Sequence, residues 1–168
     1  MRDEQMNRTE QLKKFSMIVD ANSQMLPLMF PPRVVIEPPE KFKTETTKAA
    51  LDTTGEKIGI NSKYLAEITE DEKNPYRAWI ILSHECRHAY QIHNGEDFSD
   101  YFTPRGNVDE YNSQLAEIDA WAWSFYVCGA LFSIRPTIPS ISPTTLEKIL
   151  ARTDEIVAER KRRLMQGF

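Results

Sequence analysis

Cysteine is scarce in this 168-residue sequence, and apolar runs long enough to cross a bilayer are absent from it. The two cysteines, Cys86 and Cys128, are too few for a disulfide framework, and both lie in helical patterns, so we expect free, buried thiols. The missing apolar runs exclude a membrane-spanning protein. The first ten residues are polar and lack the apolar core of a secretion signal, so we expect a cytoplasmic protein.

Basic residues are not in excess either. The chain has 21 Lys and Arg against 25 Asp and Glu, which gives a formal net charge of −4. The basic cluster at 160–163 ends a predicted helix, where the helix dipole favours cations, and a solvated helix end is its ordinary interpretation. We therefore expect neither a nucleic-acid partner nor a membrane partner.

The pattern of apolar residues, prolines and glycines predicts one α+β domain over residues 1–168. Two predicted strands flank the turn 53–56 as a hairpin, so we expect a small antiparallel sheet. Asn74-Pro75 should begin the central, apolar helix and Asn94-Gly95 should end it. In chain order the predicted elements are an N-terminal helix within 1–22, strands 33–37, 48–52 and 57–61, and helices 74–93, 109–133 and 142–165.

The central predicted helix carries a short run with metal chemistry. Residues 84–88 read His-Glu-Cys-Arg-His, inside helix 74–93. Positions four apart on an α-helix lie about 40° apart around its axis, so His84 and His88 project from one face. Two such imidazoles can hold a zinc ion, and Glu85 would stand beside a water molecule as its general base.

Other histidine arrangements can be weighed against this motif. His93 lies five positions after His88, which rotates it by about 140° on the helix, so it should not share an ion with the motif. A metzincin would place Gly and His three and six positions after His88, but these are Gln91 and Asn94, which excludes that class. The alternative to a metal-binding motif is a pair of surface histidines beside an ordinary glutamate.

A hydrolytic zinc site needs a third protein ligand. Glu117 lies on the predicted helix 109–133, and a crossing of that helix over the motif helix would bring its carboxylate to the ion. Asp109 and Glu110 are further ligand candidates. Their ordinary roles are those of a helix cap and a first-turn acid.

These residues resemble the gluzincin group of zincin-like metallopeptidases, whose downstream helix bears Glu-x-x-Ala. Residues 117–120 read Glu-Ile-Asp-Ala. The chain is similar in size and element order to minimal and ImmA/IrrE-like bacterial and phage gluzincins. The resemblance implies a zincin-like fold, Zn²⁺ held by His84, His88 and Glu117, Glu85 as base and proton shuttle, and hydrolysis of peptide bonds. It also implies that the strand nearest the motif helix, expected at 57–61, aligns an extended peptide by edge pairing.

The chain departs from this group at Trp121, where an Asp or Asn usually orients a zinc-bound imidazole. Asp119 is either a substitute for that acceptor or a plain surface acid, and the sequence leaves both interpretations open. The group that stabilises the transition state is open as well. Its candidates are Tyr101, Tyr111, His93 and Arg105.

The sequence thus predicts a zinc metallopeptidase that acts on a peptide or protein, with the small sheet packed on helix 74–93. The alternative is a catalytically silent, zinc-stabilised regulatory or protein-interaction domain on the same scaffold. Trp121 favours the alternative. Glu85 argues against it, because a structural zinc site fills all four positions with ligands and needs no neighbouring carboxylate.

Overall fold

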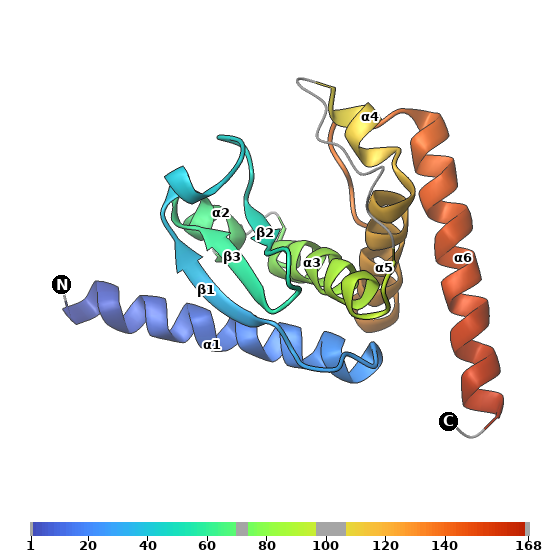
Figure 1. Cartoon of the computed structure of the whole chain (residues 1–168), viewed down its shortest axis with the longest axis horizontal. Coiled ribbons are helices and arrows are strands. Elements are labelled where there is room, and N and C mark those ends of the chain that lie inside the picture. Colours follow the sequence, from blue (N-terminus) through green and yellow to red (C-terminus); the bar gives the residue numbers. More distant parts are fainter. Residues whose placement is uncertain (1, 70–73, 97–106, 167–168) are drawn as a thin grey trace. The chain divides into compact units, whose positions relative to one another are not determined.

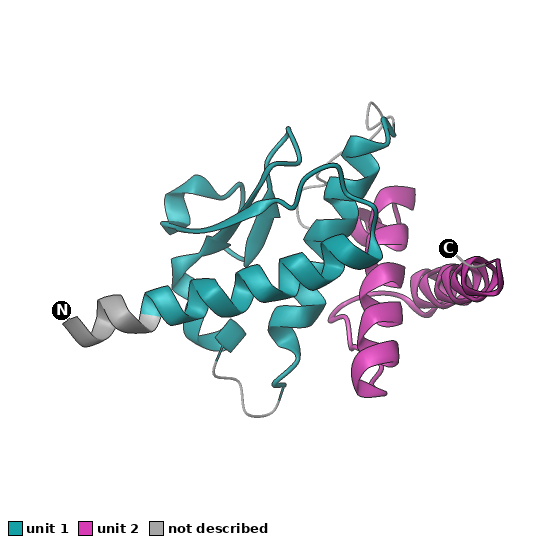
Figure 2. Ribbon diagram, turned by 90° about the horizontal axis from the view of Figure 1, so that it is seen from below, with its two compact units in different colours: residues 1–96 teal, residues 97–168 magenta. Residues whose placement is uncertain are grey.

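The structure is a computed structural model that describes residues 2–69, 74–96 and 107–166. Over these residues the chain forms an α+β fold with six α-helices, two short 3-10 helices and one three-stranded sheet (Figure 1). The chain divides into two compact units, residues 1–96 and residues 97–168 (Figure 2).

The first unit contains the whole sheet. Its elements are α1 (Arg2–Met25), β1 (Arg33–Glu37), η1 (Pro39–Lys41), β2 (Ala49–Leu51), β3 (Lys57–Asn61), η2 (Ser62–Tyr64), α2 (Leu65–Thr69) and α3 (Arg77–His93). The long helix α1 packs against α3 and β1, and α3 also packs against β2. The helix that carries the His-Glu-Cys-Arg-His run is therefore packed against both a helix and the sheet.

The sheet is mixed, so the prediction of an antiparallel sheet was wrong in part. Its strand order is β1-β3-β2. Strands β2 and β3 form the predicted antiparallel hairpin, with Ala50 opposite Gly59, whereas β1 runs parallel to β3, with Val35 opposite Gly59. A parallel pair needs a long crossover connection, which the segment 38–56 provides. The central strand is β3, and its Ile58 is fully buried.

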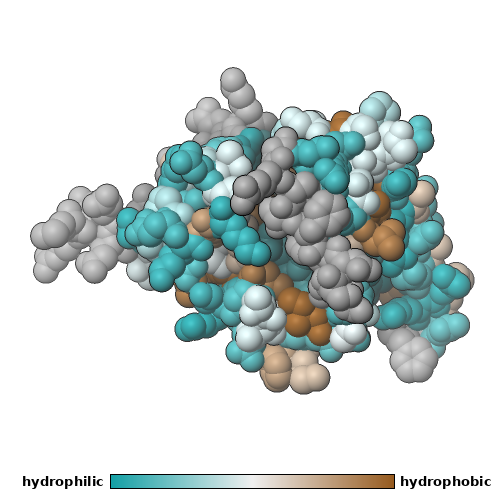
Figure 3. All heavy atoms as spheres, turned by 45° about the horizontal axis from the view of Figure 1, so that its top comes forward, coloured by the Kyte–Doolittle hydropathy of each residue, from teal (hydrophilic) through white to brown (hydrophobic). Residues whose placement is uncertain are grey.

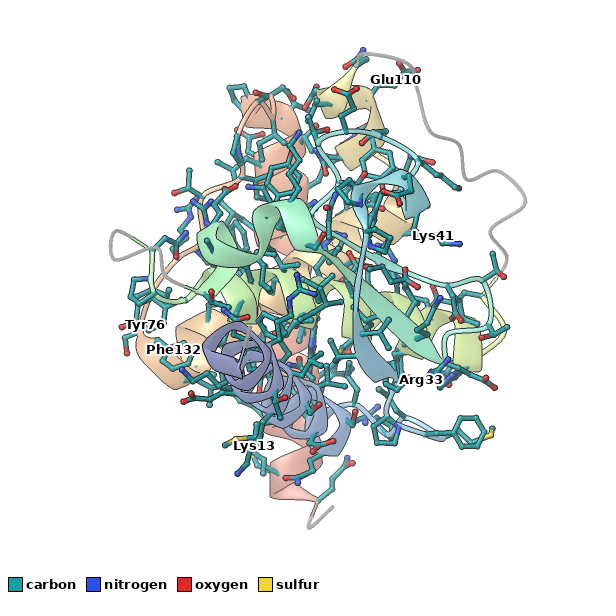
Figure 4. The ribbon with its side chains drawn as sticks, turned by 90° about the vertical axis from the view of Figure 1, so that its left-hand side faces the viewer. Lys13, Arg33, Lys41, Tyr76, Glu110 and Phe132 are labelled. Atoms are coloured by element: carbon teal, nitrogen blue, oxygen red, sulfur yellow. The ribbon has the colours of Figure 1, made fainter. Side chains whose placement is uncertain are left out.

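Helix α1 carries an apolar stripe at helical spacing. Phe15 and Val19, four residues apart, are both almost completely buried, and Leu26 just beyond the helix is buried with them. Lys13, on the opposite side, is exposed and points outward from α1 (Figure 4). The helix thus contributes one apolar face to the core of the first unit.

The second unit is helical in its described part. The predicted helix 109–133 is in fact two helices, α4 (Val108–Asn112) and α5 (Leu115–Phe132), because Gln114 has extended backbone angles and interrupts the helix. Helix α6 (Pro143–Met165) begins as predicted, with Ser142 as its cap, whose hydroxyl accepts a hydrogen bond from the Thr145 amide. Helices α5 and α6 pack closely on one another.

The face of the molecule shown in Figure 3 carries mainly polar side chains. Hydrophilic residues cover most of the face shown in Figure 3, and the hydrophobic colour is confined to smaller areas between them. Among the helices of residues 2–69, 74–96 and 107–166, none is both long and apolar enough to cross a membrane.

The turn between β2 and β3 is held by one carboxylate. Asp52 accepts hydrogen bonds from the Thr54 hydroxyl and from the amides of Glu56 and Lys57. Partial burial alone would raise the pKa of Asp52, but these hydrogen bonds outweigh it and lower the pKa below its ordinary value. Gly55 completes the turn in the left-handed region, at φ +76°.

Gly55→Ala is expected to destabilise the protein by about 1–2 kcal/mol, because an L-residue is strained at this φ. The added Cβ would also lie 3.1 Å from Nε2 of His93. Urea unfolding of the full chain measures the change. Gly129→Ala is the matched control, since Gly129 lies in α5 and a Cβ there would meet no atom closer than 3.9 Å. We expect this control to gain about 0.5–1 kcal/mol. Equal effects of the two substitutions would contradict the turn geometry.

Candidate metal centre

Helix α3 brings the two motif histidines together as predicted. The helix begins at Arg77, three residues later than expected. Asn74 and Pro75 form a turn instead, in which the Asn74 carbonyl accepts a hydrogen bond from the Arg77 amide. Its end at His93, followed by Gly95 at φ +70°, is confirmed. No proline interrupts the helix, so residues four apart stand one above the other on a largely buried element.

The two imidazoles face each other through their Nε2 atoms. Nε2 of His84 lies 3.0 Å from Nε2 of His88, and the rings are nearly perpendicular, with centroids 4.6 Å apart. Two nitrogen ligands of one tetrahedral zinc ion, each about 2.05 Å from the metal, lie roughly 3.3 Å apart. The observed spacing is close to this value. The pair therefore fits two ligands of a single ion.

Glu85 is connected to the sheet. Its carboxylate accepts a hydrogen bond of 3.0 Å from the backbone amide of Leu51 in β2. Because Glu85 directly follows His84, this bond holds a carboxylate beside the two imidazoles and against the backbone of a strand. A base placed in this way cannot turn freely into solvent.

The strand beside α3 is β2, and β2 is an edge of the sheet. The backbone of Lys48 and Asp52 is hydrogen-bonded to β3, so the backbone groups of Ala49 and Leu51 point away from β3. The strand expected to offer its edge, β3, is instead central and paired on both sides. That expectation was wrong, because the parallel pairing of β1 was not foreseen.

Gln91 is a site residue that sequence reasoning missed. Its side-chain oxygen lies 2.8 Å from Nδ1 of His88, and the residue is fully buried. The signal available in the sequence was the spacing of three between His88 and Gln91, which places both side chains on one helix face. A glutamine on a helix is usually a surface residue, so this spacing alone does not single it out.

Glu117 lies in the first turn of α5, where the helix dipole favours a carboxylate, and it is fully buried. Burying an ionised carboxylate costs several kcal/mol unless hydrogen bonds, a counter-charge or a metal ion compensate for it. His84 and His88 of the first unit and Glu117 of the second make up a set of two imidazoles and one carboxylate that could hold a metal ion.

Two other acids considered for the site, Asp119 and Asp109, have structural partners in the second unit. Asp119 forms a 2.8 Å ion pair with Arg152 of α6, and its side chain is only 14% exposed, so it is not a plain surface acid. Asp109 accepts a 2.6 Å hydrogen bond from the Ser142 amide, and this bond lowers the pKa of Asp109. Glu110 is exposed on α4 (Figure 4).

Trp121 donates from its indole nitrogen to the side-chain oxygen of Asn112, at 2.7 Å. This residue occupies the position where the gluzincin group usually has an imidazole acceptor, and here it supplies a donor instead. This hydrogen bond ties α5 to α4. The indole nitrogen of Trp121 therefore offers no acceptor to an imidazole.

Both cysteines are free and buried, as predicted. Burial raises the pKa of the Cys86 thiol far above its ordinary value, and the negative charges of Glu85 and Asp20 raise it further. Burial raises the pKa of Cys128 to about 12. Cys86 lies two residues from each histidine, about 200° around the helix axis, so its thiol projects from the opposite face of α3 and does not join them as a ligand.

Of the candidates for transition-state stabilisation, the described part of the first unit contains His93. The ring of His93 packs edge-on against Phe30, with centroids 5.6 Å apart, which agrees with its predicted separation from the motif. Tyr111 lies in α4 of the second unit. Tyr101 and Arg105 lie outside the described residues.

Comparisons of this chain with models of protein families, with curated proteins and with solved structures found no match. The function is therefore inferred from the residues and their geometry.

Proposed function

We propose that this protein is a zinc-dependent peptidase in which His84, His88 and Glu117 hold the metal and Glu85 is the general base. The observation that carries the proposal is the grouping on α3. Two imidazoles converge through Nε2 at 3.0 Å, and the carboxylate next to them is anchored to a backbone amide of an edge strand.

The donor set supports zinc as the metal. Neutral imidazole nitrogen and carboxylate oxygen are both common zinc ligands, and three protein ligands leave one coordination position open, as in hydrolytic zinc sites. Cys86 projects from the opposite face of α3 and does not add a fourth ligand. A bound zinc ion would act as a Lewis acid that polarises the scissile carbonyl and makes water more acidic.

Glu85 performs the proton transfers in this proposal. Its carboxylate takes a proton from the attacking water as the new carbon–oxygen bond forms, and it returns that proton to the leaving amine as the carbon–nitrogen bond breaks. The Leu51 amide, which donates to one carboxylate oxygen, holds the side chain in place during both transfers.

The edge strand supports a peptide as the substrate. Backbone groups of Ala49 point away from β3, on the edge of β2 that Glu85 also contacts through Leu51. An extended peptide can add to such an edge by main-chain hydrogen bonds, which would place a peptide bond near the base.

The test is metal content and metal-dependent hydrolysis of the untagged full chain. Elemental analysis for zinc, iron, manganese and nickel is expected to find a single zinc ion per chain. Cleavage of a fluorogenic peptide library and of an unfolded, labelled protein should stop when 1,10-phenanthroline removes the metal and should resume when zinc is restored. A chain that neither retains nor takes up zinc would contradict the proposal, and so would hydrolysis that persists without metal.

A further inference from the structure

The hydrogen bond between His88 and Gln91 defines which nitrogen of His88 carries its proton. The side-chain oxygen of Gln91 is an acceptor only, and it lies 2.8 Å from Nδ1 of His88. In a neutral imidazole one nitrogen donates and the other carries a lone pair. Nδ1 must then be the donor, and the lone pair lies on Nε2, the atom that faces His84.

We propose that Gln91 is a positioning residue that holds the His88 ring in the Nδ1–H tautomer and thereby presents Nε2 to the metal. This inference rests on the proposed function for its purpose, although the tautomer itself does not depend on a metal. A ligating histidine generally donates its second N–H to a fixed acceptor, which orients the ring and makes it a better ligand.

The burial of Gln91 supports this role. The side chain is fully buried on α3, whose other buried positions include Leu82, Cys86 and Ala89. A buried amide without hydrogen bonds costs free energy that an apolar side chain of the same size would not cost. Its contact with His88 gives a reason for a glutamine at this position.

Gln91 also supplies an imidazole acceptor, which Trp121 does not. The gluzincin group takes an imidazole acceptor from the downstream helix, but Trp121 supplies a donor that bonds Asn112 of its own unit. Here the acceptor comes from the helix that carries His88, one turn further along. One ligand is thus oriented entirely within the first unit.

The experiment reads the tautomer and the zinc affinity separately. In the ¹⁵N-labelled, metal-stripped full chain at pH 8, long-range ¹H–¹⁵N NMR should show His88 with its proton on Nδ1. Gln91→Met keeps the side-chain length but removes the acceptor. It should give a mixture of His88 tautomers and zinc binding weakened by about 10–100-fold in a chelator competition. Gln91→Glu restores an acceptor oxygen and should restore both properties.

Gln11→Met is the matched control. Gln11 is also a buried glutamine of the first unit, and its side chain donates to Thr69 on α2 instead of the histidines. The Gln11→Met variant should leave the His88 tautomer and the zinc affinity unchanged. Circular dichroism should show that both Met variants are folded.

A wild-type His88 with its proton on Nε2 would overturn the inference even if no variant folded. Unchanged tautomer and affinity in Gln91→Met would overturn it as well. A wild-type chain that shows the Nδ1–H tautomer, loses it in Gln91→Met, and binds no zinc would support the orienting contact and overturn the proposed peptidase function.

Discussion

Glu85→Gln is expected to slow peptide hydrolysis by about 10²–10⁴-fold while zinc stays bound at the wild-type stoichiometry. The amide has the size of the carboxylate, and its oxygen can still accept from the Leu51 amide as Glu85 does. What it loses is the ability to take a proton from water. Because Glu85 is not a proposed ligand, the metal content should not change.

Elemental analysis measures the zinc content and the peptide assay measures the rate of hydrolysis, both on the same preparation. The control is Glu56→Gln, which removes an exposed carboxylate in the β2–β3 turn and should alter neither. Full activity of Glu85→Gln would remove Glu85 from the mechanism. If the wild-type chain binds zinc and a hydroxamate, which needs an open coordination position, but cleaves no peptide, a silent regulatory or interaction domain would be the better description.

Glu117→Gln is expected to weaken zinc binding by more than about 100-fold, because residues that only orient a ligand already contribute 10–100-fold. An amide oxygen is a much poorer ligand than a carboxylate, so zinc content should fall well below a single ion per chain after dialysis. Glu117→Ala should do the same, and chelator competition gives the affinity of each variant.

Two acids of the same unit serve as controls for Glu117. Asp119→Asn weakens the ion pair to Arg152, and Asp109→Asn weakens the hydrogen bond to the Ser142 amide. Both substitutions can lower stability, but neither should lower zinc affinity. Wild-type zinc binding in Glu117→Gln would disprove Glu117 as the third ligand, and a loss confined to Asp109→Asn would assign that role to Asp109.

Features that depend on local spacing could be predicted from the sequence. The face shared by His84 and His88 follows from the helical period, and the end of α3 follows from Gly95, whose positive φ suits glycine. The hairpin around Gly55 follows from its turn residues. Each of these features is decided within a few residues, where the chemistry of the side chains is enough.

Features that depend on distant partners could not be predicted in this way. Alternation identifies 33–37 as a strand but does not say that it pairs parallel to β3. Asp119 meets Arg152 from another helix, which no spacing along the chain indicates. The break at Gln114 carries neither proline nor glycine, so the apolar pattern runs through it. Gln91 was missed because its role depends on burial.

His84, Glu85, His88 and Gln91 come from little more than two turns of α3, a helix packed against α1 and β2. Their spacing depends on the backbone hydrogen bonds of that helix, and local opening of a protein spares its most buried helices and strands longest. Amide hydrogens along 84–91 should accordingly be among the slowest of the first unit to exchange with solvent. Fluctuations that fray the ends of α1 or open the β2–β3 turn would then leave the order and spacing of these four side chains unchanged.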